Sequence, residues 1–126
     1  MNRYDIMNYI QHRYDIEPEY LWDKFPDYAV FRHPNNGKWF AIIMNVDTTS
    51  VGIEHEGPRS MVNSTECDLL VIKADPEDVE FYKTQPGFGP AYHMNKKHWL
   101  SILVSGPADE EDVLGFVDES YRLTLL

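Results

Sequence analysis

The sequence contains a single cysteine, Cys67, so the chain has no intramolecular disulfide. Disulfides persist mainly in oxidising compartments, and their absence is consistent with a reducing one. Cys67 stands between Glu66 and Asp68, whose negative charges disfavour the thiolate form of the side chain. We therefore expect an unreactive cysteine and a fold that is stabilised without disulfides.

Long hydrophobic runs are also missing, because the longest unbroken one, Trp39–Met44, covers six residues. A membrane-spanning helix needs about 20 apolar residues in succession. Residues 1–5 (Met-Asn-Arg-Tyr-Asp) lack the apolar segment of a secretory signal. We expect a cytoplasmic protein that does not bind membranes.

Basic residues are scarce: 11 lysines and arginines stand against 21 acids, which gives a net charge of −10. Such a protein repels polyanions at long range, and this disfavours nucleic acid as a partner. The acids gather at residues 109–112 and 118–119, whereas two lysines and two histidines lie together in residues 93–98. A locally basic patch on an acidic protein is therefore compatible with the sequence.

The residues that are present suffice for a folded core. A chain of 126 residues has the usual size of one domain, and we assign residues 1–126 to a single domain. Hydrophobic residues make up 43% of the sequence and aromatic residues 13%, too many for a chain held open by its charge. We expect most of the aromatic side chains to lie in the core.

Local patterns predict an antiparallel α+β fold. A helix is expected over residues 2–14, capped by Asn2, and turn residues Pro34–Gly37 indicate a hairpin. Asp75-Pro76 is a typical helix start, with Asp75 as the cap. The other expected elements are strands over residues 28–33, 38–44, 51–54, 68–74, 91–94 and 99–104 and helices over 76–85 and 109–123.

The strand at residues 51–54 is the weakest of these signals, and the order without it is α-β-β-β-α-β-β-α. Helices are too few and too segregated for parallel βαβ units. We predict two layers: an antiparallel sheet of about five strands with the helices mainly on one face.

No catalytic, cofactor or metal motif is present in the sequence. His93 and His98 are five residues apart, a spacing that places them together only across a tight turn, and no third ligand is near in sequence. The acids after Asp75 and those at 109–112 are explained by helix starts. We predict no catalytic residue, no metal site and no cofactor, and we expect the histidines to form local hydrogen bonds.

One polar segment, residues 87–99, has a composition suited to binding. It holds two histidines, an asparagine, two lysines and several aromatic residues within a stretch bounded by turns. Lysines can contact phosphates while aromatic rings stack on bases. The alternative is a polar hairpin tip anchored in the core by Tyr92 and Trp99.

Five blocks of the sequence together resemble the MmcQ/YjbR family. They occur in the family's order and cover most of the chain, and the fourth is the most specific. The blocks are Phe25-Pro26-Asp27-Tyr28-Ala29-Val30-Phe31-Arg32-His33, Lys38-Trp39-Phe40-Ala41, Asp68-Leu69-Leu70-Val71-Ile72-Lys73, Pro90-Ala91-Tyr92-His93-Met94-Asn95-Lys96-Lys97-His98-Trp99 and Asp118-Glu119-Ser120-Tyr121.

The resemblance implies an α-β3-α-β2-α fold similar to that of secretion chaperones. It also implies DNA binding through two hairpin "wings", here Pro34–Gly37 and Asn95–Lys97. We would then expect weak, non-specific DNA binding by a set of wing residues. These are Arg32, His33, Lys38, His93, Asn95, Lys96, Lys97 and His98.

The strong negative charge departs from this expectation and favours a second interpretation. In that interpretation the chain is an acidic protein-interaction or chaperone-like module. The two hypotheses differ in surface: wings require a contiguous basic face, whereas an interaction module requires an exposed apolar patch. An enzyme would instead require a pocket in which His93 or His98 meets a buried carboxylate.

Overall fold

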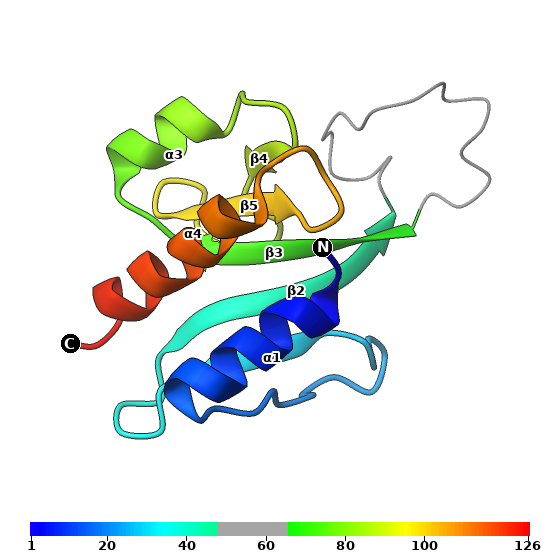
Figure 1. The fold of residues 1–126 in the computed structure, drawn as a ribbon, viewed down its shortest axis with the longest axis vertical. Helices are drawn as coiled ribbons and strands as arrows, with labels where there is room; N and C mark the ends of the chain where they lie inside the picture. The colour runs from blue at the N-terminus through cyan, green and yellow to red at the C-terminus, as the bar shows by residue number, and fades with distance from the viewer. Residues whose placement is uncertain (48–65) are drawn as a thin grey trace.

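The computed structural model describes residues 1–47 and 66–126, which form one antiparallel sheet with helices packed on it (Figure 1). The sheet has five strands in the order β1-β2-β3-β5-β4, and all described pairings are antiparallel. The elements in chain order are α1 (Arg3–Tyr14), β1 (Ala29–Arg32), β2 (Trp39–Asp47), β3 (Glu66–Lys73), α3 (Pro76–Tyr82), β4 (Phe88–Pro90), β5 (Trp99–Leu103) and α4 (Glu110–Leu123).

The three helices of the described residues lie on one face of the sheet, as predicted, with α1 and α4 in front of it in Figure 1. Ile6 and Ile10 of α1 and Val113 and Val117 of α4 are fully buried against this face. Burial of such side chains stabilises the fold by about 1.5–3 kcal/mol each. No helix in the described ranges has both the length and the hydrophobicity needed to cross a membrane.

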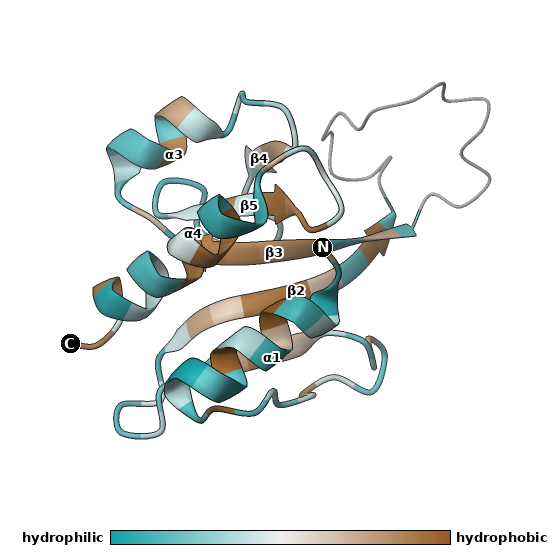
Figure 2. Ribbon diagram, in the orientation of Figure 1, coloured by the Kyte–Doolittle hydropathy of each residue, from teal (hydrophilic) through white to brown (hydrophobic). Residues whose placement is uncertain are grey.

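The opposite face of the sheet carries a second apolar cluster. Its buried members include Val30, Ile42 and Val71, and the indole rings of all three tryptophans pack against it. Trp22 makes edge-to-face contacts with Trp39 and Tyr28 at centroid distances of 5.8 and 5.9 Å. Figure 2 shows the strands mostly brown, the colour of hydrophobic residues, because both of their faces are covered.

Helix α1 begins where the sequence predicts. Asn2 accepts hydrogen bonds from the backbone N–H groups of Tyr4 and Asp5, and the Asp5 carboxylate accepts one from the Asn2 N–H at 2.8 Å. This reciprocal arrangement is a capping box. The middle helix differs, because Asp75 holds the N-cap position of α3 with extended backbone but its side chain makes no capping hydrogen bond. The predicted cap by Asp75 is thus positional only.

The predicted strand over residues 91–94 is wrong. The partner of β5 is instead β4, which ends at Pro90. His93 has a φ of 61°, a left-handed conformation that no strand allows. The N–H of Tyr92 bonds the hydroxyl of Ser101 at 3.0 Å in place of a strand carbonyl, so pairing stops there.

The remaining strands agree with the prediction to within a few residues. The β1–β2 turn forms at Pro34–Gly37, where Gly37 has a φ of 73°. Strand β2 continues to Asp47, beyond the predicted end at Met44, and pairs there with Glu66 of β3. The expected strand over 51–54 lies outside the described residues.

Candidate functional site

The two predicted wings lie at the same end of the sheet. Because neighbouring strands are antiparallel, both hairpin turns lie at the same end of the sheet. One turn joins the end of β1 to the start of β2, and the other joins the end of β4 to the start of β5. The two turns are separated by three strand spacings, or about 14 Å. The fold therefore permits both turns to contact one elongated ligand. Whether DNA could be that ligand depends on the side chains.

At the first wing, the side chain of Arg32 is not available for a phosphate. Its guanidinium donates to both carboxylate oxygens of Glu19, at 2.6 and 2.7 Å. Such a bidentate pair neutralises the charge of the guanidinium and fixes the orientation of its N–H donors. Lys38 is exposed and has no ion-pair partner among residues 1–47 and 66–126.

His33, predicted as a polar contact to DNA, belongs to the core. Its side chain is buried, with the ring Nε2 2.7 Å from the hydroxyl of Thr124 and the ring 4.4 Å from that of Tyr121. Burial lowers the pKa of His33, as does the nearby charge of Lys38, against a backbone hydrogen bond at Tyr121 that raises it. Its role is therefore to join β1 to the end of α4.

In the second wing, Asn95 organises the turn. Its side-chain oxygen accepts from the backbone N–H groups of Lys97 and His98, at 2.9 and 3.3 Å. The ammonium of Lys96 donates to the carbonyl of Ala91 at 2.8 Å, so this lysine folds back on its own loop. Lys97 is exposed and has no ion-pair partner in the described part of the chain.

The histidine side chains of this loop make only local contacts within residues 1–47 and 66–126. The ring of His93 lies 3.9 Å from that of Tyr92 and is exposed, and the main-chain carbonyl of His98 accepts from Ala74 at 2.9 Å. Neither side chain contacts a carboxylate in the described ranges. No group of three potential ligands that could hold a metal ion occurs there either. Among the predicted wing lysines and arginine, Lys38 and Lys97 are the two that are exposed and make no side-chain contact within the described residues.

The last block of the sequence resemblance is structural. The Asp118 carboxylate accepts from the hydroxyls of Tyr9 (2.6 Å) and Tyr14, both on α1. Ser120 is fully buried; its hydroxyl accepts from the Lys73 N–H at 2.9 Å and donates to the Phe40 carbonyl at 2.6 Å. These side chains fix α4 on α1 and on the sheet.

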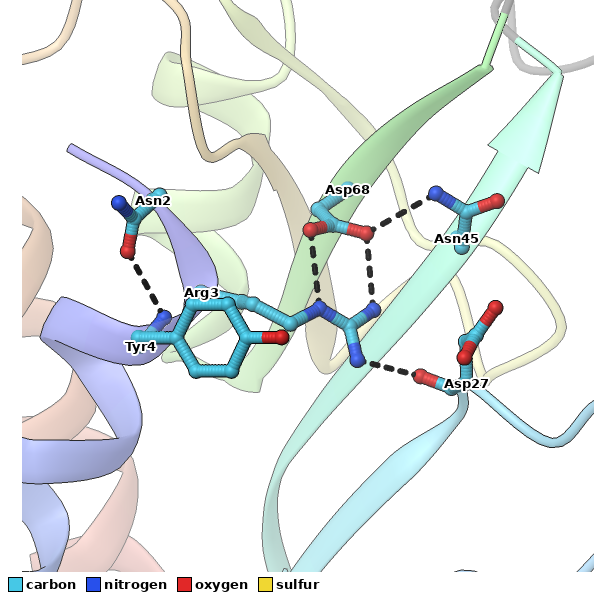
Figure 3. Close-up of polar contacts among 6 residues, drawn as sticks. All are labelled: Asn2, Arg3, Tyr4, Asp27, Asn45 and Asp68. Carbon is cyan, nitrogen blue, oxygen red and sulfur yellow. Dashed lines mark hydrogen bonds and ion pairs between the residues drawn. The ribbon is translucent and has the colours of Figure 1, made fainter.

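A second polar cluster connects α1 to the sheet (Figure 3). The Arg3 guanidinium donates to both oxygens of Asp68, at 2.9 and 2.8 Å, and to the Asp27 carbonyl at 2.7 Å. The amide of Asn45 donates to Asp68 at 3.2 Å. Although burial opposes it, these hydrogen bonds hold the pKa of Asp68 below its ordinary value. The polar groups of the cluster hydrogen-bond to one another, and the cluster therefore joins α1 to the sheet.

Cys67 fits the expectation of an unreactive thiol. It is half-buried, and desolvation followed by the charges of Asp68 and Asp47 raises its pKa to about 11. Since the thiolate is the nucleophilic form, little of it exists near neutral pH.

One concave surface was not revealed by the sequence: a groove of about 620 Å³ between α3 and α4. Three aromatic rings that pack on the core line it, those of Tyr82, Phe88 and Phe116, with centroids 5.0 to 5.7 Å apart. Phe81 also lines the groove and is 61% exposed. Five carboxylates line it as well: Asp78, Asp109, Glu111, Asp112 and Glu119.

The groove contains no basic residue among its lining side chains. Glu119 is paired with Arg122 on the same helix. The other four carboxylates have no ion-pair partner in residues 1–47 and 66–126. The sequence carried no signal for this groove, because its lining depends on how α3 and α4 pack.

Comparison with known proteins gives consistent matches. The family model described as YjbR matches residues 12–123. The chain is 33% identical over 124 residues to the uncharacterized protein YyaQ of Bacillus subtilis (strain 168), covering 98% of each chain. A crystal structure of a protein from Pseudomonas syringae is 39% identical, with a TM-score of 0.87 over 98% of this chain and 99% of that one.

A more distant structure shares the fold alone. It is that of the Deinococcus radiodurans protein DR2400, which is 19% identical with a TM-score of 0.69, over 97% of this chain and 77% of that chain. Its similarity at this low identity shows that the arrangement of sheet and helices tolerates large sequence change.

Proposed function

The chain belongs to the YjbR family, and we propose that it is a non-enzymatic binding module whose partner is a protein. The observation that carries this proposal is the exposed apolar groove between α3 and α4, lined by carboxylates. An exposed apolar surface of this kind is typical of interaction sites. The net charge of −10 supports it further, because such a surface repels nucleic acid at long range.

Binding rather than catalysis is favoured by the surroundings of the histidines. A general base requires a partner that positions it and adjusts its pKa. His93 lies exposed on a turn, and His33 is buried in a structural contact with Thr124. Neither is placed, within the described residues, against a carboxylate in a pocket.

DNA binding is the second candidate, and the shared end of the two hairpins favours it. With Arg32 paired to Glu19 and Lys96 bonded to Ala91, two free lysines remain. Two phosphate contacts give a log–log salt slope of about −1.8, at about −0.9 per contact. Binding of that kind is too weak to persist at physiological salt on an acidic protein.

The test is a fluorescence-anisotropy titration of labelled duplex DNA at several salt concentrations. We expect no binding at physiological salt and, at low salt, a slope no steeper than about −1.8 that Lys38→Ala with Lys97→Ala abolishes. Lys24→Ala with Lys83→Ala, which removes the same charge from lysines elsewhere in the chain, serves as a control for net charge. A slope near −3.6, reduced by about two in Lys96→Ala with Lys97→Ala, would instead establish the DNA function.

A further inference from the structure

The groove between α3 and α4 combines two features that single out one kind of occupant. Its base is aromatic, from rings that already pack on the core, and Phe81 offers most of its ring to solvent. Around this apolar base stand carboxylates from both helices. An apolar ligand without charge would satisfy the rings alone, whereas a polyanion would be repelled by the acids.

We propose that this groove binds a short basic, amphipathic segment of a partner protein, in which a large apolar side chain is flanked by lysine or arginine. This inference rests on the proposed protein-binding function and names the partner's chemistry. The apolar side chain contacts Phe81 and Phe116, and the flanking cations approach Asp78 on α3 and Glu111 and Asp112 on α4. Amphipathic segments commonly dock into grooves between helices in this way.

The acids at the start of α4 have a structural role, but this role leaves their carboxylates free to bind a ligand. Glu111 and Asp112 lie in the first turn of α4, where negative charge complements the helix dipole. A dipole contact neutralises neither carboxylate. The aromatic base between the helices has no relation to the helix dipole. Because the aromatic rings and the carboxylates line the same groove, the ligand that fits it is both apolar and basic.

The shape of the groove also allows an occupant to approach. Gly115 lines it from α4, and a Cβ placed on this glycine would meet no atom within 4 Å. Empty space therefore stands over the backbone at this position. The volume of about 620 Å³ lies within the range of about 300–1,000 Å³ that ligand sites occupy. A side chain such as phenylalanine or leucine fits, with room for its neighbours.

A second copy of this chain is a poor occupant. Its own sequence contains 21 acids against 11 bases, so two acidic molecules would repel each other at the groove. A basic partner gains from the same field, which raises its association rate and makes binding weaken with salt.

The experiment uses the full chain and a fluorescein-labelled amphipathic peptide with leucine and phenylalanine on one face and lysine on the other. Two control peptides replace the lysines by glutamate or the apolar residues by serine. We expect the basic amphipathic peptide to bind and both controls to fail. Binding should weaken with salt without vanishing, because the apolar contact is not screened.

Groove variants locate the site. Phe81→Ala removes an exposed ring and should weaken binding about tenfold. Glu111→Gln with Asp112→Asn should weaken it about three- to tenfold, whereas Glu17→Gln with Asp23→Asn removes the same charge elsewhere and should leave it unchanged. Gly115→Phe fills the empty space and should block binding, while Gly115→Ala should not. Thermal unfolding of each variant establishes that it is folded.

Three outcomes would overturn the inference. If the peptide binds equally to the groove variants and the wild type, a different surface binds it, although a protein-binding function survives. If no peptide binds, the partner's chemistry is wrong, and the DNA titration then decides separately whether the proposed function also fails. A dimer in sedimentation that Phe81→Ala dissociates would show that the groove serves self-association.

Discussion

At the scale of single residues, the polar side chains that looked suited to ligand binding mostly stabilise the fold. His33 contacts Thr124, Arg32 contacts Glu19, and Asn95 orders its own turn. Residue type alone did not separate these roles, because a histidine at a hairpin can face water or the core. The separation depends on the tertiary neighbours that each side chain meets.

The buried His33 should make stability depend on pH. Its pKa is lowered in the folded protein, mainly by desolvation, so the unfolded chain binds a proton more readily. Stability is therefore complete above the unfolded value of about 6.5 and falls as pH drops below it, by at most about 1.4 kcal/mol per pH unit. Urea unfolding between about pH 7 and pH 5 measures this slope.

The matched variants are His33→Gln and His12→Gln. Glutamine at position 33 retains an N–H donor for Thr124 but does not titrate, so the slope assigned to His33 should disappear. His12 is exposed on α1, and its replacement should leave the slope unchanged. A slope that persists in His33→Gln would assign the pH dependence to other groups.

At the scale of helices and strands, the sequence predicted most of the fold. Capping at Asn2, the turn at Pro34–Gly37 and the helix start at Pro76 are local signals, and each is found in the structure. The predicted strand at Ala91–Met94, the first of the last hairpin, is wrong, because its residues are strand-like but His93 is left-handed. The groove between α3 and α4 was not predictable, since it depends on how two helices distant in sequence pack.

Helix α4 is held on the sheet by a polar contact that a substitution can test. Ser120→Ala removes the hydroxyl that joins the Lys73 N–H to the Phe40 carbonyl and leaves both groups without this partner in a buried setting. We expect a loss of about 1–3 kcal/mol, even though alanine favours helices by about 0.5 kcal/mol. Urea unfolding gives the difference, and the exposed Ser105→Ala is the matched control. Equal stability of the two variants would show that the bridge contributes nothing.

At the scale of the whole molecule, a sheet that is apolar on both faces is enclosed by elements fixed through a few long-range polar ties. Helix α1 is joined to α4 through Asp118 and to β3 through Asp68. The groove between α3 and α4 is lined by other side chains than those of these ties. The aromatic rings and carboxylates of this groove are the surface on which the proposed binding of a basic protein partner depends.

The tie between Arg3 and Asp68 allows a final prediction. The two side chains are only 12% and 23% exposed, so removal of one leaves the other largely buried without its partner. Arg3→Ala should therefore destabilise the protein by about 1–3 kcal/mol, and Asp68→Asn by a similar amount. The double variant should cost less than the sum of the two, because the partner left behind is no longer charged.

The same pair should make stability depend on pH. Since the pKa of Asp68 is lowered in the folded protein, the contribution of Asp68 to stability is present above about pH 4 and is lost as pH falls through the folded value. Urea unfolding of the four proteins, at neutral and at acidic pH, measures both effects, and strictly additive losses at neutral pH would show that the pair does not couple α1 to the sheet.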